Sequence, residues 1–230
     1  MKVWALQLSM KEDYRPYLGA ISQDRQERIE LLRHNSDRLR SVCGELLVRK
    51  YFSELPGMSH QAVRFTTGPY GKPYAANLPD VHFTVSHAGR WVVAAFAGLP
   101  VGIDVEQVQL PIDPAVPNLV MSAAELLEYV RLRDEEKGAY FYRVWTLKES
   151  FVKALGAGLS MDPATITLAA DACMVNGNRI SARFMEYDLD ENYRTAVCVL
   201  GDAPIPAVAE QLEMSCFDRL LADIAVASIS

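Results

Sequence analysis

The sequence reads Val101-Gly102-Ile103-Asp104-Val105-Glu106 in one stretch and Trp145-Thr146-Leu147-Lys148-Glu149-Ser150-Phe151-Val152-Lys153 in another. The first stretch is typical of a β-strand, in which alternate side chains share a face. Asp104 and Glu106 therefore point the same way, while the valines and the isoleucine face apolar surroundings. Two carboxylates side by side indicate a bound cation.

The second stretch is typical of a helix, because aromatic, acidic and apolar residues recur at helical spacing until Gly156 and Gly158 end the pattern. Glu149 and Lys153 are four residues apart and share a face. If this helix packs beside the strand, Glu149 joins Asp104 and Glu106 in an all-oxygen site suited to Mg²⁺. Lys153 would then lie within reach of a departing phosphate.

Each stretch has an ordinary alternative explanation. An Asp-x-Glu pair on a strand is more often part of a solvated face, and a Glu/Lys pair at this spacing is usually a surface ion pair of small value. From the residues of either stretch alone, both interpretations stay open.

Together the stretches resemble two signatures, G-[IV]-D-[IV]-E and W-[ST]-x-K-E-[SA]-[FY]-x-K, of the 4'-phosphopantetheinyl transferases of the surfactin-synthetase-activating (Sfp) type. The resemblance extends upstream to Tyr70-Gly71-Lys72-Pro73 and to the segment His82 to Trp91, and it is thin beyond Ser160. It implies an α+β fold of two similar α/β subdomains related by a pseudo-twofold axis, with the active site between them. We expect subdomains at 1–106 and 122–230, joined by a linker at 107–121.

The resemblance also implies a reaction. Coenzyme A is the donor, and a serine of an apo acyl or peptidyl carrier protein attacks its β-phosphate, giving the holo carrier and adenosine 3',5'-bisphosphate. Asp104, Glu106 and Glu149 would hold Mg²⁺, with Mn²⁺ as a substitute. Glu149 or a metal-bound water would take the serine proton, and Lys153 would stabilise or protonate the leaving phosphate.

The coenzyme side follows partly from the same resemblance. Gly71, Lys72 and Pro73 offer a tight turn that would clamp the adenine and its phosphate, although such a turn is most often a plain surface feature. Lys148 lies about 100° round the helix from Glu149, so it is either a phosphate contact or a helix-positioning residue. The residues expected to bind coenzyme A are Arg25, Arg28, Arg40, Gly71, Lys72, Pro73, Ser86, His87, Lys148 and Lys153. For the three arginines a solvated charged face is about as good an explanation.

The sequence also bears on other classes of function. A Ser-His nucleophile is excluded because no Gly-x-Ser-x-Gly elbow surrounds Ser86 and adjacent strand residues face opposite sides. A metal-dependent nucleotide phosphotransferase or hydrolase would turn over coenzyme A without any carrier. A catalytically silent carrier-binding protein is disfavoured, because no carboxylate of the expected set is missing.

Composition agrees with this interpretation. The chain has 230 residues, 50% of them hydrophobic, and a mean hydropathy of +0.02, as expected of a globular protein. No apolar stretch approaches the roughly 20 residues of a membrane helix, and no signal peptide is recognised, so we expect a cytoplasmic protein. A net charge of −6 argues against nucleic acid as a partner. The chain is long enough for two halves, which favours a monomeric enzyme that accepts many different carriers. These carriers would be those of fatty-acid, polyketide or nonribosomal-peptide synthesis, including the synthesis of antibiotics.

Patterning predicts the remaining elements. Strands are expected at 2–8, 62–66, 81–86, 91–97, 102–106, 165–169, 173–175, 179–184 and 193–199, and helices at 22–33, 37–53 and 122–136 and around Lys148. Asn176-Gly177 predicts a type I' hairpin. Prolines mark 107–121 as an irregular linker. Its Leu119, Val120 and Met121 either contact the carrier or are part of an ordinary flexible linker, which is the better explanation from the residues. The tail, 206–230, is expected to cap the second sheet, and the four scattered cysteines are expected to be reduced and mostly buried.

Overall fold

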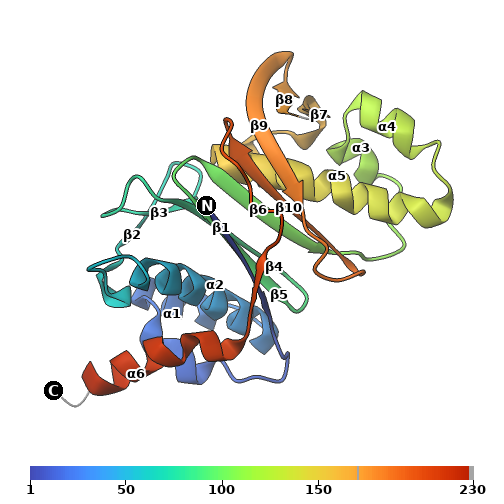
Figure 1. The fold of residues 1–230 in the computed structure, drawn as a ribbon. Coiled ribbons are helices and arrows are strands. Elements are labelled where there is room, and N and C mark those ends of the chain that lie inside the picture. Colours follow the sequence, from blue (N-terminus) through green and yellow to red (C-terminus); the bar gives the residue numbers. More distant parts are fainter. Residues whose placement is uncertain (170, 228–230) are drawn as a thin grey trace.

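The computed structural model describes residues 1–169 and 171–227, and it has the expected α+β composition in two halves (Figure 1). Short 3₁₀ segments connect several elements. The strands and α-helices are β1 (Lys2–Gln7), α1 (Gln23–Glu30), α2 (Asn35–Ser53), β2 (Phe65–Thr67), β3 (Pro73–Ala75), β4 (His82–Ala88), β5 (Trp91–Ala97), β6 (Val101–Gln107), α3 (Val116–Val120), α4 (Ala123–Tyr129), α5 (Asp134–Leu155), β7 (Ile166–Ala169), β8 (Ala172–Val175), β9 (Asn178–Glu186), β10 (Tyr193–Leu200), β11 (Glu210–Leu212) and α6 (Asp218–Ala227).

Within the described residues the strands form a four-stranded sheet, a five-stranded sheet and a separate two-stranded one. The strand order is β11-β1-β5-β4 in the first sheet, β6-β10-β9-β8-β7 in the second, and β2-β3 in the third. The orders β1-β5-β4 and β6-β10-β9 repeat one antiparallel scheme, and in each half a long helix, α2 or α5, follows the first strand. The two halves are therefore built alike, as the resemblance implied.

The two large sheets pack face to face. One side of β5 lies in the cluster that α2 covers, and the other side meets the second sheet through Val93, Ala95, Ile103 and Val197. Burial on both faces explains why β5 is an unbroken apolar run rather than an alternating one. Apolar side chains between the sheets thus hold the halves together.

The edge strands β4 and β6 meet between the sheets through a side chain. The Thr84 hydroxyl donates to the Val101 carbonyl at 3.4 Å, and it accepts a hydrogen bond from the Ile103 amide at 2.9 Å. This contact aligns β4 with β6, so that Ser86 lies beside Asp104.

Two organisational predictions need correction. Strand β6, expected in the first subdomain, pairs with β10 of the second sheet. The tail does not cap the second sheet: β11 pairs in parallel with β1, and Phe217 and Leu220 lie in the core of the first half. Figure 1 shows α6 beside α1 at that end of the molecule. Helical periodicity shows that a tail buries one face, but not which sheet it covers. Residues 228–230 of the predicted tail lie outside the described residues.

The predicted linker is also more ordered than its prolines suggested. It contains the helix α3, and Val120 and Met121 are buried, which leaves only Leu119 of the expected carrier contacts exposed. The helix predicted at 122–136 is interrupted. Its first part, α4, begins with a capping box at Ser122 and ends at Tyr129, and α5 begins at Asp134, where the Glu136 carboxylate accepts a hydrogen bond from the Arg133 amide at 3.2 Å.

Other predictions are confirmed. The Asn176-Gly177 turn has positive φ at both residues, and the four cysteines are free, three of them buried. Within the described part of the chain, no helix is long and apolar enough to cross a membrane.

Candidate active site

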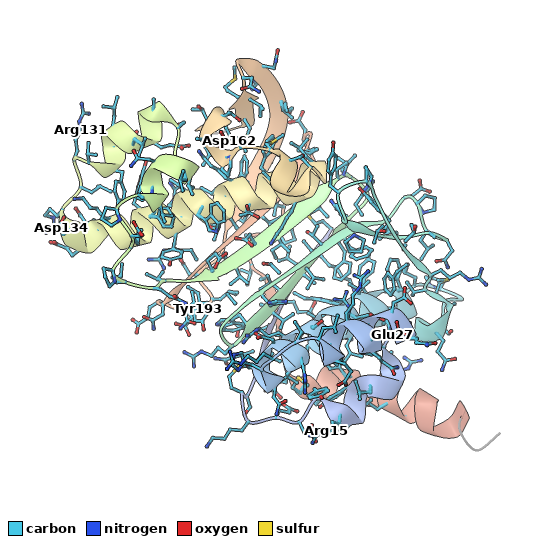
Figure 2. The ribbon with its side chains drawn as sticks, turned by 180° about the vertical axis from the view of Figure 1, so that it is seen from behind. Arg15, Glu27, Arg131, Asp134, Asp162 and Tyr193 are labelled. Carbon is cyan, nitrogen blue, oxygen red and sulfur yellow. The ribbon has the colours of Figure 1, made fainter. Side chains whose placement is uncertain are left out.

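The site begins with the close approach of α5 to β6, which a glycine permits. A Cβ atom on Gly102 would lie 1.9 Å from the Ser150 carbonyl oxygen and 2.5 Å from the Ala154 nitrogen. Only glycine leaves this space. The helix therefore lies directly on the strand, as it does in Figure 2, and the side chains of Glu149 and Lys153 come near Asp104.

Asp104 is the centre of the site and is only 2% exposed. Its Oδ1 atom accepts a hydrogen bond from Ser86 Oγ at 2.8 Å and an ionic one from Lys153 Nζ at 2.6 Å. Lys153 Nζ also donates to Ser86 Oγ at 2.9 Å. The second oxygen, Oδ2, is buried and has no hydrogen-bond partner among the described residues. A buried anionic oxygen without a partner is costly, so it marks a place for a cation or a donor.

The two glutamates, Glu106 and Glu149, lie near enough to Asp104 to feel its charge. Glu106 accepts a hydrogen bond from the Trp145 indole nitrogen at 3.1 Å. Burial raises the pKa of Glu106, and the charge of Asp104 raises it further. Burial likewise raises the pKa of Glu149, which Lys153 lowers and Asp104 raises. The three carboxylates are thus one electrostatic cluster, in which mutual repulsion is offset by a single lysine.

The carboxylates fit a divalent cation in their chemistry. Oxygen donors of this type are the ligands that Mg²⁺ prefers, and the partnerless Oδ2 of Asp104 is free to be one. As the described side chains stand, no three of them converge as a preformed ligand set. The positive charge beside Asp104 is supplied by Lys153, at 2.6 Å.

A large basic cavity opens beside this cluster and shares Lys153 with it. Its volume is about 810 Å³. Among the described residues that line it, seven are cationic and two are acidic. The cations are Arg25, Arg28, Arg40, Arg49, Arg64, Lys72 and Lys153, and the acids are Asp24 and Glu45. In a chain of net charge −6, such a concentration of positive charge indicates a polyanionic ligand.

Comparison with known proteins decides the family. Residues 7–98 match a family model described as 4'-phosphopantetheinyl transferase, N-terminal, and residues 100–198 match one described as 4'-phosphopantetheinyl transferase superfamily. The chain is 33% identical over 219 residues to the 4'-phosphopantetheinyl transferase Sfp of Bacillus subtilis (strain 168), which covers 93% of this chain and 95% of that protein. The chain belongs to the 4'-phosphopantetheinyl transferase superfamily.

Two further relatives support this placement. The 4'-phosphopantetheinyl transferase psf-1 of Bacillus pumilus is 31% identical over 96% of this chain and 97% of its own length. The L-aminoadipate-semialdehyde dehydrogenase-phosphopantetheinyl transferase of Rattus norvegicus is 30% identical over 62% of this chain and 50% of its own length. The predicted Sfp-type family and enzyme class are therefore confirmed.

Within this transferase, most of the predicted coenzyme residues gather at the cavity. Arg25, Arg28, Arg40, Lys72, Pro73, His87 and Lys153 line it. Gly71 forms the adjacent turn with a φ of +82° and does not line the cavity. Ser86 is buried, and its hydroxyl is committed to Asp104.

The prediction that Lys148 contacts a phosphate is wrong in this structure. Its side chain is fully buried and away from the cavity. The ammonium pairs with Glu125 at 2.6 Å and donates to the carbonyls of Val120 and Pro163 at 2.8 and 2.9 Å. Since these acceptors use its three N–H groups, the other prediction, a helix-positioning residue, agrees with the contacts.

Sequence reasoning missed part of the cavity wall on α2. Glu45 is 4% exposed and accepts hydrogen bonds from the Ser22 amide at 2.6 Å and from Arg25 and Arg49 at 3.3 and 2.8 Å. It thereby fixes the start of α1 and two arginines against the cavity. The Glu45/Arg49 pair at i, i+4 was the available signal, but the spacing alone resembles a solvated ion pair.

Proposed function

We propose that this transferase moves the 4'-phosphopantetheine group of coenzyme A to a serine hydroxyl of apo acyl or peptidyl carrier proteins, in a reaction that depends on Mg²⁺. One observation carries the proposal: Lys153 lines the basic cavity and also bonds Asp104 of the carboxylate cluster. A ligand in the cavity thus has its anionic end next to the groups that can act on it.

The cavity suits coenzyme A in size and charge. Its volume of about 810 Å³ lies in the range of cofactor sites. Coenzyme A carries a pyrophosphate and a 3'-phosphate, and guanidinium groups bind phosphate oxygens in bidentate fashion. Arg28 and Arg64 are exposed at the cavity, where they can receive the 3'-phosphate. Phe65 and Tyr70 supply aromatic surface for the adenine.

The chain's own groups divide the chemical work between them. Glu149 is the base that accepts the proton of the attacking serine, and burial raises the pKa of its carboxyl, which makes the carboxylate a stronger proton acceptor. Lys153 stabilises or protonates the phosphate that leaves as adenosine 3',5'-bisphosphate. Asp104, Glu106 and Glu149 would hold Mg²⁺ or Mn²⁺, which would neutralise charge on the pyrophosphate. Trp145 orients Glu106 for this purpose.

The carrier is the macromolecular partner. The net charge of the transferase is −6, and carriers are commonly acidic, so docking must rest on apolar contacts or on a local basic patch. Leu119 on α3 is 67% exposed and offers such an apolar contact. The carriers would be those of fatty-acid, polyketide or nonribosomal-peptide synthesis.

The test is intact-mass spectrometry of an apo peptidyl carrier domain incubated with the protein, coenzyme A and Mg²⁺. The expected result is a mass gain of one phosphopantetheine group that disappears with a chelator. Asp104→Ala and Glu149→Gln should abolish the gain. Glu135→Gln is the matched control, because Glu135 is an exposed carboxylate beside Asp134 at the opposite end of α5 (Figure 2).

The other outcomes separate the alternatives. Release of adenosine 3',5'-bisphosphate without a mass gain would indicate a hydrolase. Binding of coenzyme A with no turnover, across several apo carriers, would indicate a silent binding protein. Transfer at the wild-type rate by folded Asp104→Ala would refute the assignment of the carboxylate cluster.

A further inference from the structure

The β2–β3 hairpin forms one wall of the cavity and is a small sheet of its own. Phe65, Thr66 and Thr67 of β2 line the cavity. The turn that follows is closed by a hydrogen bond from the Gly68 amide to the Lys72 carbonyl at 2.9 Å. A two-stranded sheet is only marginally stable alone, so the position of this wall depends on what it contacts.

Lys72 connects this hairpin to the second half of the molecule. Its Nζ atom donates to the carbonyls of Lys153 at 2.6 Å, Val101 at 3.1 Å and Ala154 at 3.3 Å. Lys153 and Ala154 lie in the last turn of α5, where the carbonyls lack the usual i+4 amide partner and need other donors. The Lys153 carbonyl also accepts a hydrogen bond from the Gly156 amide at 3.3 Å. A cation at this end of a helix is favoured by the helix dipole.

The fit around this contact is close. A Cβ atom on Gly156, which ends α5 with a φ of +72°, would lie 3.3 Å from Lys72 Cδ. Burial lowers the pKa of Lys72 to about 8, so the amine is charged at neutral pH although it is largely removed from solvent. The three carbonyls compensate for the lost hydration.

These contacts bear on the expectation that Gly71, Lys72 and Pro73 form a turn that clamps the adenine of coenzyme A and its phosphate. An ammonium has three N–H groups, and all three are given to backbone carbonyls. Lys72 nevertheless lines the cavity.

We propose that Lys72 is a positioning residue that ties the ligand-binding hairpin to β6 and α5, and so sets the place of Lys153 and Asp104 relative to the bound donor. The carbonyl acceptors of Lys72 belong to the segments that carry the reacting groups. Val101 begins the strand that carries Asp104, and one of the carbonyls is that of Lys153 itself. The inference rests on the proposed function, because the reacting groups it positions are those assigned there.

The test compares Lys72→Met, Lys72→Arg and Lys11→Met. Methionine keeps an unbranched stem and removes the ammonium, arginine keeps a charge, and Lys11 is an exposed lysine outside the site. We expect Lys72→Met to lower kcat by about 100-fold, as small misplacements of reacting groups do, with little change in the KM for coenzyme A. Lys72→Arg should recover part of the loss, and Lys11→Met should equal the wild type. A raised KM with unchanged kcat in Lys72→Met, or no change in either, would overturn the proposal.

Hydrogen exchange provides a readout that does not need transfer. The amides of Gly156 and Ala157 bond carbonyls of the last turn of α5, so they should exchange faster in Lys72→Met than in the wild type or in Lys11→Met. If the wild type transfers nothing, the proposed function fails, while this comparison still decides whether Lys72 holds the end of α5. Unchanged exchange at both amides would count against the tether.

Discussion

Replacing Lys148 by methionine should destabilise the protein while leaving the coenzyme site intact. Its side chain is 1% exposed and that of its partner Glu125 is 10% exposed. The substitution keeps most of the volume but leaves Glu125 buried without its cation. It also removes the donor to the Val120 and Pro163 carbonyls.

The size of the effect follows from this environment. Removing one partner of a buried ion pair costs about 3–5 kcal/mol, because the other charge stays buried. A protein of this size loses about 2–4 °C of Tm per kcal/mol, so Tm should fall by roughly 6 to 20 °C. Adding Glu125→Gln should restore part of the loss, because glutamine carries no charge and can still serve the capping box with Ser122.

The assay is thermal unfolding followed by circular dichroism, together with the KM for coenzyme A below the melting range. Lys137→Met is the control, because Lys137 is on the same helix and its ion pair with Asp134 is at the surface. We expect its Tm to equal that of the wild type. A Lys148→Met variant with unchanged Tm and a tenfold higher KM for coenzyme A would refute the structural role of Lys148. That result would support the hypothesis that Lys148 contacts a phosphate of coenzyme A.

Three other perturbations follow from the site. Gly102→Ala should lower Tm and kcat together, because its Cβ would meet the Ser150 carbonyl at 1.9 Å and push α5 from β6; an unaltered melting curve would contradict this. Trp145→Phe should lower kcat about tenfold, the value of one hydrogen bond to a charged group, because Glu106 loses its indole donor; initial rates at saturating substrates measure it. The difference in unfolding free energy between the wild type and Lys72→Met should increase as the pH rises from about 8 to 10.5. In that window the amine of Lys72 has lost its proton in the folded protein but keeps it in the unfolded chain, so the wild type becomes relatively more stable. Urea titrations at both ends of the window measure this difference, and a fall with pH would reverse the sign.

Local patterns were good guides to chemistry in this chain. Asp104 and Glu106 share a face because strand side chains alternate, and Glu149 and Lys153 share one because they are four apart on a helix. The Asn176-Gly177 turn was likewise readable from neighbouring residues. Each of these features depends on backbone geometry over a few residues, which amino-acid types determine directly.

The burial of the charged side chains at the site could not be predicted from the sequence. Asp104 looks like an exposed metal-site anion in the sequence, yet it is buried and held by Ser86 and Lys153. Glu45 resembles one half of a surface ion pair, yet it is buried under two arginines. The exposure of a charged residue depends on which distant parts of the chain pack against it, and the spacing of residues in the sequence does not contain that information.

By itself, the sequence determined the family, the strand at 101–107, the helix that carries Glu149 and Lys153, and the carboxylates that line one site. Only the tertiary structure decided that β6 pairs with β10, that the tail returns to β1, and that Lys72 and Lys148 bond backbone carbonyls. The physical reason is that periodicity reports which face of an element is buried, whereas the partner of that face is chosen by packing among residues far apart in the chain.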